Sequence, residues 1–274
     1  MITIETTIIK PENFPDGTLR LNISDKTLDI INSSKKIDIT WAYDYDAELF
    51  ILQCLIDKIR DINPTIVINL NLPYIPHARM DRAHSNNCFT LKTFCNLINS
   101  MNFDHIFVLN SHSDVSTALL NRVIVEPTKA VDFVNSLGDD NFIIMYPDAG
   151  AAKKFSSLIQ KNYITANKIR DWKTGKIKDY HIVTNGIEIK DKSIVIVDDI
   201  CSYGGTFYYA AKALKELGAG DIYLHVDHCE NSVLEGDMIK SGLIKEIWTT
   251  DSIYTKGEHE RIHVKHLYRA KEEN

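Results

Sequence analysis

The sequence predicts an α/β protein with mainly parallel sheets, and three observations lead to this. Short apolar runs rich in β-branched residues alternate with longer stretches of helical spacing. Polar residues directly follow several of these runs, as they do at the carboxyl edge of a parallel sheet. A similar series starts again after Pro127. We therefore expect two α/β domains, residues 1–127 and 128–274, each a mainly parallel sheet flanked by helices.

The apolar runs predict strands, and the stretches between them predict helices. In the stretch 46–62 apolar side chains recur on one helical face, and Pro64 marks its exit. The expected strands are residues 65–70, 105–109, 142–146, 193–197, 221–226 and 245–249, and the clearest helices are 46–62, 90–101 and 206–217.

Composition narrows the class of protein. The chain has 274 residues and a net charge of −6, with no basic stripe interleaved with aromatic residues, so we expect no nucleic-acid partner. No apolar run is long enough to span a membrane, and the first residues lack a signal-peptide pattern, so we expect a cytoplasmic protein. Five scattered cysteines without C-x-x-C spacing indicate reduced thiols and no zinc site.

The strongest functional pattern is the stretch from Ser193 to Gly220. A buried strand precedes two carboxylates, and a short loop of hydroxyl and glycine residues leads into a helix. Free backbone N–H groups at a helix N-terminus bind phosphate, and the carboxylates can accept hydrogen bonds from ribose hydroxyls. The combination indicates a ribose 5-phosphate site, although each part alone is more often a turn or a helix cap. The residues are Asp198, Asp199, Ser202, Tyr203, Gly204, Gly205 and Thr206.

Other stretches leave alternatives open on local sequence alone. Residues 13–21 read as a turn. Arg79 and Arg82 follow a strand, where they would bind a polyphosphate or form a solvated basic loop. His112 could ligate a metal or be an ordinary loop histidine. Asp148 opens a helix that is either a second anion site or a capped amphipathic helix.

The segments FPDG, YIPHARMDR, SHS, PDAGAAKK and VDDICSYGGT, in this order, resemble the ribose-phosphate diphosphokinase (PRPP synthetase) family. The resemblance covers nearly the whole chain, from Phe14 to Ile253. It implies two phosphoribosyltransferase-like domains with ATP on the first and ribose 5-phosphate on the second. It also implies Mg²⁺ and a homo-oligomer.

Residue roles carry over from the family by position. The ATP-binding residues would be Phe14, Asp16, Arg79, Asp81, Arg82 and His112. His112 and Asp148 would be associated with magnesium, and the acid pair and the following loop would bind ribose 5-phosphate. The family also has a mobile loop with a Lys-x-Arg pair, which Lys168 and Arg170 match as catalytic residues.

Several positions depart from the family pattern and leave other functions open. Thr18, Met80, Asn110 and Tyr203 differ from the usual residues. The bulk of Tyr203 would suit a larger acceptor that contains ribose 5-phosphate, such as ADP-ribose. A PRPP-dependent phosphoribosyltransferase would share the phosphate loop but would not need FPDG, ARMDR or a second α/β half. A regulatory homologue without turnover is the non-enzymatic alternative.

Overall fold

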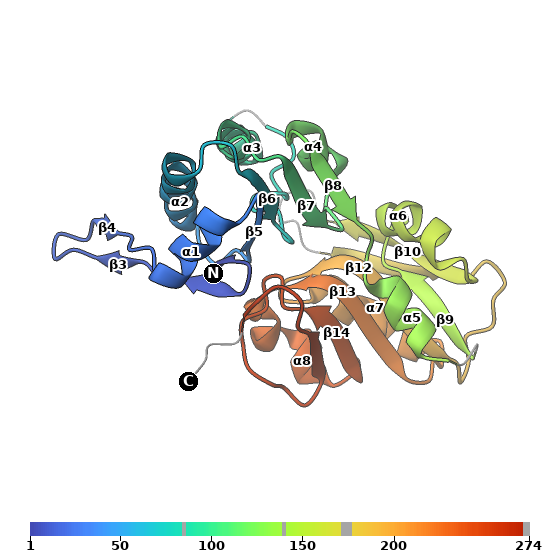
Figure 1. Ribbon diagram of the computed structural model, residues 1–274. Helices are drawn as coiled ribbons and strands as arrows, with labels where there is room; N and C mark the ends of the chain where they lie inside the picture. Colours follow the sequence, from blue (N-terminus) through green and yellow to red (C-terminus); the bar gives the residue numbers. More distant parts are fainter. Residues whose placement is uncertain (84–85, 139–140, 171–176, 271–274) are drawn as a thin grey trace. The chain divides into compact units, whose positions relative to one another are not determined.

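The chain forms two compact units, each built on its own sheet. The computed structural model describes residues 1–83, 86–138, 141–170 and 177–270, without the side chains of residues 168–170 and 177–179. Unit 1 comprises Met1–Pro127 and the segment that begins at Leu267, and unit 2 comprises Thr128–His266. The sequence prediction extended the second half to residue 274, whereas residues from Leu267 onward group with unit 1. Figure 1 shows the elements of both units.

Unit 1 contains a six-stranded sheet with the order β2-β1-β5-β6-β7-β8. Strands β5 to β8 are parallel, and β1 is antiparallel to both β2 and β5. A separate antiparallel hairpin, β3–β4, projects from the unit (Figure 1). The bounds are β1 Ile2–Ile4, β2 Thr7–Ile9, β3 Glu12–Asn13, β4 Leu19–Arg20, α1 Asp25–Ser33, β5 Lys36–Trp41, α2 Glu48–Ile62, β6 Val67–Asn71, α3 Thr90–Ser100, β7 His105–Leu109, α4 Asp114–Leu119 and β8 Val123–Glu126.

Unit 2 contains a seven-stranded sheet with the order β11-β10-β9-β12-β13-β14-β15. All neighbouring strands are parallel except β10 and β11. The bounds are α5 Ala130–Ser136, β9 Phe142–Tyr146, α6 Ala149–Ile159, β10 Tyr163–Arg170, β11 Ile177–Val183, β12 Ser193–Cys201, α7 Gly205–Glu216, β13 Ile222–Cys229, η1 Asn231–Glu235, α8 Asp237–Ser241, β14 Glu246–Thr250 and β15 Ile262–Lys265.

The central strand β12 shows why unit 2 folds as a covered parallel sheet. Ile194 and Ile196 pack into one hydrophobic cluster with α7 and α8, and Val195 and Val197 pack into another with α5 and α6. Alternate side chains of a strand point to opposite faces, so a strand covered on both faces reads as a continuous apolar run. The predicted α/β class with mainly parallel sheets is confirmed. Along the described chain, no helix has the length and apolar character needed to cross a membrane.

Two local predictions need correction. Asp198 and Asp199 lie within β12, which pairs with β13 as far as Cys201, rather than after the strand. Lys168 and Arg170 were expected on a loop, but their backbone belongs to β10, which pairs antiparallel with β11. Hydrogen bonds to β13 extend β12 beyond the predicted strand 193–197, and pairing with β9 and β11 forms β10, which was not predicted as a strand.

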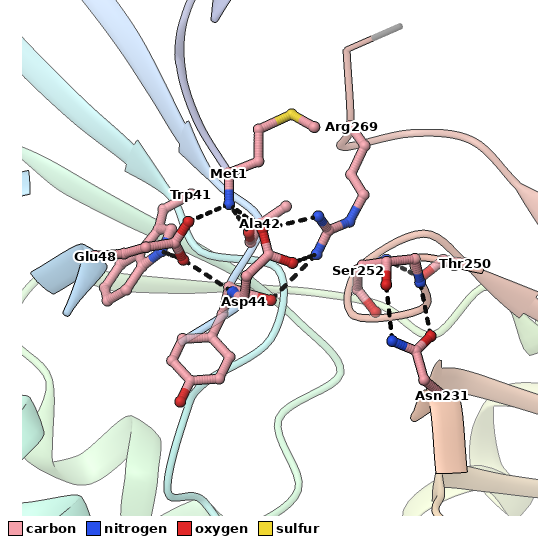
Figure 2. A network of polar contacts seen from close by, with 11 residues as sticks. Met1, Trp41, Ala42, Asp44, Glu48, Asn231, Thr250, Ser252 and Arg269 are labelled. Carbon is pink, nitrogen blue, oxygen red and sulfur yellow. Dashed lines mark hydrogen bonds and ion pairs between the residues drawn. The ribbon is translucent and has the colours of Figure 1, made fainter. Parts of the chain in front are cut away.

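A partly buried ionic network ties the ends of the described chain to unit 1 (Figure 2). The carboxylate of Glu48, 5% exposed, accepts hydrogen bonds from the indole of Trp41 at 2.8 Å and from the amino group of Met1. Nη2 of Arg269 lies 2.9 Å from Oδ1 of Asp44, and the same guanidinium donates to the carbonyl of Tyr43 at 3.1 Å. Arg269 therefore holds the segment after Leu267 on unit 1.

Replacing Arg269 should lower the stability of unit 1. Partial burial opposes ionisation of Asp44, but Arg269 and the amino group of Met1 outweigh it and lower the pKa of Asp44. Arg269→Ala leaves this carboxylate partly uncompensated. We expect the free energy of unfolding, measured by urea titration, to fall by about 1–3 kcal/mol.

Arg20→Ala is the matched control, because Arg20 is 54% exposed and lies 3.8 Å from Glu12. It should change the free energy of unfolding by less than about 0.5 kcal/mol. Equal effects of the two substitutions would contradict a stabilising role for the Arg269 contact.

Candidate functional site

Two adjacent carboxylates lie at the carboxyl end of β12 in unit 2. Asp199 is 6% exposed, and its Oδ2 lies 3.3 Å from Nζ of Lys154 on α6. The backbone N–H of Asp199 donates to Oδ1 of Asp198 at 2.9 Å. Lys154 therefore supplies Asp199 with a cation, and the sequence motif PDAGAAKK provides that lysine.

Asp198 experiences a different electrostatic environment. Burial raises the pKa of Asp198 well above its ordinary value, and the negative charges of Asp199 and Asp148 raise it further. Tyr180 on β11 belongs to the same neighbourhood, since burial, Asp148 and Asp198 all raise the pKa of its phenol. Unit 2 thus concentrates negative charge around Asp198, which favours binding of a cation or of hydroxyl donors.

The loop after β12 leads directly into helix α7 and leaves its first turn available. Gly204 is the N-cap residue, with a left-handed φ of 78°, and no side chain of the described chain caps this helix. A Cβ atom added to Gly205 would meet nothing within 4 Å. There is therefore room beside Gly205, and no described side chain caps the first N–H groups of α7, as the predicted phosphate cup requires.

The same loop is packed tightly from behind. A Cβ atom on Gly236 would lie 1.9 Å from the carbonyl oxygen of Tyr203, and one on Gly204 would lie 2.7 Å from Sδ of Met238. The hydroxyl groups of Ser202 and Ser232 are 3.2 Å apart. Sequence reasoning missed Gly236, Met238 and Ser232, because they lie some thirty residues further along the chain and carry no motif of their own.

The helix that Asp148 opens is capped by its own side chain. Oδ1 of Asp148 accepts the N–H of Ala151 at 2.9 Å at the start of α6. Of the two alternatives that the sequence left open, the structure favours the capped helix, since this carboxylate already serves the helix N-terminus.

Unit 1 gathers part of the predicted ATP side. Asp81 accepts a hydrogen bond from Nε of Arg82 at 3.1 Å and another from the hydroxyl of Ser113 at 3.1 Å. Burial alone would raise the pKa of Asp81, but Arg82, Ser113 and the nearby His112 together lower it. The ARMDR and SHS segments therefore meet, as expected for loops that follow neighbouring parallel strands.

The FPDG segment forms the tip of the β3–β4 hairpin. Oδ1 of Asp16 accepts from the backbone and the hydroxyl of Thr18 at 3.0 and 2.6 Å. Phe14 is 49% exposed, and its ring lies 5.9 Å from the guanidinium of Arg20. The ATP role that Phe14 and Asp16 would share with Arg79 and Arg82 remains a prediction.

Two further predictions concern the catalytic pair and the magnesium-associated residues. The side chains of Lys168 and Arg170 lie outside the described residues. His112 belongs to unit 1 and Asp148 to unit 2. Among the described residues, no group of three or more His, Cys, Asp and Glu side chains forms a metal site. Mg²⁺ commonly uses one or two carboxylates together with substrate phosphates, and Asp148 and Asp198 fit that kind of binding.

Known proteins match the chain over the same segments. A phosphoribosyl transferase domain model matches residues 149–236, from α6 to the glycine behind the loop. A ribose-phosphate pyrophosphokinase of Staphylococcus saprophyticus is 28% identical over 88% of this chain and 76% of its own length. One of Marinomonas is 27% identical over 72% of this chain but only 64% of its own length. The chain is a relative of the ribose-phosphate pyrophosphokinases.

The family resemblance drawn from the motifs is confirmed, pyrophosphokinase and diphosphokinase being two names for one activity. A solved structure of the phosphoribosylpyrophosphate synthetase of Mycobacterium smegmatis superposes with a TM-score of 0.72. It is 17% identical and covers 94% of this chain and 86% of its own. The predicted fold of two phosphoribosyltransferase-like domains is thereby confirmed.

Substitution of Gly236 should disrupt the loop from behind. Gly236→Ala places a methyl group against the carbonyl of Tyr203, so either the loop or α8 has to move. We expect a loss of about 1–3 kcal/mol in the free energy of unfolding by denaturant titration. Gly257→Ala is the control, because its Cβ meets nothing within 4 Å. A Gly236 variant as stable as the control would contradict this packing.

The charge at Asp198 should appear in the pH dependence of stability. The folded-state pKa is raised to about 8 from an ordinary value of 3.8. As the pH rises through that window, the unfolded chain releases a proton that the folded chain retains, so the wild type loses stability. Asp198→Asn removes this loss, and its advantage over the wild type should grow from pH 4 to 8 by at least about 1 kcal/mol.

Urea titrations at several pH values measure this difference. Asp191→Asn, which removes a carboxylate from an exposed turn, is the matched control for the loss of one acidic group. Parallel pH profiles for the wild type and Asp198→Asn would show that the pKa of Asp198 is not raised.

Proposed function

We propose that the protein is a ribose-phosphate diphosphokinase. It would transfer the β,γ-diphosphoryl group of ATP to the anomeric hydroxyl of ribose 5-phosphate, giving PRPP and AMP. The observation that carries the proposal is the uncapped N-terminus of α7 beside the acid pair of β12, in the stretch matched by the phosphoribosyl transferase model. The similarity to ribose-phosphate pyrophosphokinases supports the choice of reaction.

The acceptor would bind to unit 2. Backbone N–H groups from Ser202 to Thr206 would hold the 5-phosphate, with the helix dipole adding to their attraction. Asp198 and Asp199 would accept hydrogen bonds from the ribose hydroxyls. Nζ of Lys154 lies 3.3 Å from Oδ2 of Asp199, a contact that favours the acceptor role of this carboxylate.

The ATP side would be formed by residues of unit 1. Phe14, Asp16, Arg79, Asp81, Arg82 and His112 are the proposed ATP-binding residues. His112 and Asp148 would hold Mg²⁺, and the negative charges of Asp199 and Asp148 beside Asp198 would also favour a cation. When bound, Mg²⁺ neutralises charge on phosphate oxygens.

The proposed catalytic groups are Lys168 and Arg170. Diphosphoryl transfer asks little covalent chemistry of the protein, so positioning and charge neutralisation provide most of the acceleration. Two cations above the transferred group would stabilise the charge that develops in the transition state.

One observation favours a second candidate acceptor. The side chain of Tyr203, in the middle of the phosphate loop, is 57% exposed. An exposed ring at this position offers a stacking surface to a ribose 5-phosphate that forms part of a larger nucleotide, such as ADP-ribose. The chemistry at the anomeric hydroxyl would be unchanged.

We also propose a cytoplasmic homo-oligomer without a nucleic-acid or membrane partner. The exposed ring of Phe14 on a projecting hairpin supports an oligomer, since exposed aromatic residues often mark protein contacts (Figure 1).

The direct test is to incubate the protein with Mg-ATP and a panel of acceptors and to identify products by mass. Ribose 5-phosphate should give PRPP and AMP. Product from ADP-ribose alone would select the second candidate. Product only from PRPP and a free base would identify a phosphoribosyltransferase, and acceptor binding without any product would identify a silent homologue.

Lys168→Ala or Arg170→Ala should lower kcat by about 100-fold or more. Ribose 5-phosphate binding, measured by calorimetry, should remain, because the acceptor cup belongs to other residues. Lys161→Ala, which removes a partly exposed lysine of unit 2 outside the proposed site, is the matched control and should retain turnover. Unchanged kcat in both variants would remove Lys168 and Arg170 from the mechanism.

A further inference from the structure

A glutamate lies beside the loop between β12 and α7, outside the residues that the sequence assigned to the site. The backbone N–H of Glu230 donates to the carbonyl of Cys201 at 2.8 Å, and Cys201 is the last residue of β12. The next residue, Asn231, exchanges two hydrogen bonds with Thr255, at 2.7 and 2.9 Å. Glu230 is therefore fixed at the start of the loop by its own backbone and by that of its neighbour.

Two hydroxyl groups connect this glutamate to the loop. Oγ of Ser232 donates to Oε2 of Glu230 at 3.2 Å, and Oγ of Ser202 lies 3.2 Å from Oγ of Ser232. Ser202 is the first residue of the loop, and all three residues keep part of their surface exposed. The contacts therefore run from Glu230 through Ser232 to the proposed phosphate cup.

The direction of these hydrogen bonds follows from the number of hydrogens. A serine hydroxyl carries one hydrogen, and a carboxylate can only accept. Because the hydrogen of Ser232 points to Glu230, the hydrogen between the two serines has to come from Ser202. The hydroxyl of Ser202 therefore donates to Ser232 and has only lone pairs to offer a ligand.

This direction is unfavourable for phosphate. A phosphate dianion accepts hydrogen bonds, and a hydroxyl donor to a charged oxygen forms one of the stronger kinds. Lone pairs of Ser202 would repel the phosphate oxygens instead, and the negative charge of Glu230 would add to the repulsion. The phosphate would then depend on backbone N–H donors and on the remaining hydroxyl of the loop, that of Thr206.

We propose that Glu230 is a positioning residue that turns the hydroxyl of Ser202 away from the phosphate and so limits the affinity of the loop for it. The inference rests on the proposed acceptor site. In the proposed reaction the 5-phosphate is the same in acceptor and product, so a tighter hold on it would strengthen binding of both alike. A limited hold would favour release of the product.

Glu230→Gln tests this directly, because it keeps the shape of the side chain and adds an amide donor. The amide can donate to Ser232, whose hydrogen can then turn to Ser202, and the hydroxyl of Ser202 can donate to phosphate. We expect ribose 5-phosphate, titrated by calorimetry without ATP, to bind about 3–10-fold more tightly than to the wild type. A residue with a purely structural role would not give a gain in affinity when replaced.

Three further variants separate the hydroxyl from the charge. Ser232→Ala removes the acceptor for Ser202 and should tighten binding about 2–5-fold. In the Ser202→Ala background, Glu230→Gln should change the Kd by less than about 2-fold, because the hydroxyl through which it acts is absent. Glu235→Gln, which removes an exposed carboxylate from the neighbouring η1, is the matched control and should also change it by less than about 2-fold.

Unchanged or weaker binding of ribose 5-phosphate by Glu230→Gln and Ser232→Ala, both shown to be folded by urea titration, would overturn the inference. An equal gain from Glu230→Gln in the Ser202→Ala background would also overturn it, because charge alone would then explain the effect. If neither the wild type nor Glu230→Gln binds ribose 5-phosphate, the proposed acceptor site fails, and the inference fails with it. Binding by the wild type without a gain in the variants would overturn the inference alone.

Discussion

Unequal charge compensation of two neighbouring carboxylates is the constraint on which the candidate site depends. Asp198 and Asp199 belong to β12, which pairs with β13 as far as Cys201, so neither can move away from the other. Lys154 balances Asp199, whereas Asp148 and Asp199 both act against ionisation of Asp198. A sheet that covers both faces of β12 therefore maintains a local excess of negative charge. A cation bound there, as proposed for Mg²⁺, would relieve that excess.

The phosphate cup depends on glycine in two different ways. Gly204 adopts a left-handed φ of 78°, and Gly236 allows the backbone of Tyr203 to approach where any Cβ would clash. The loop is thus fixed by backbone contacts, and no described side chain occupies the N-terminus of α7. Helix α6 shows the contrast, since Asp148 caps it and satisfies the N–H of Ala151. The N-terminus of α6 is thus capped by a side chain, whereas that of α7 has no described side-chain cap.

Much of the fold could be predicted from the sequence, since strands covered on both faces appear as unbroken apolar runs. Strand β5 was not predicted, because apolar residues alternate with charged and polar ones in KIDITW. Its partner β1 lies far earlier in the chain, so the pairing leaves no local signal in the sequence. The loop between β12 and α7 was predicted because its residues are contiguous in the sequence. Gly236, Ser232 and the two environments of the acid pair were not, because they arise from contacts between segments far apart in the chain. The loop expected for Lys168 and Arg170 proved to be strand because β11 pairs with it.

Strand β12 carries the acid pair, and the loop that follows it begins helix α7. The proposed ligand-binding groups there are backbone N–H donors and carboxylates, which would suit a strongly hydrated phosphate and the hydroxyls of its sugar. Because both kinds of group lie at the end of one strand, a single ligand that carries a phosphate and hydroxyls a few bonds apart would satisfy both.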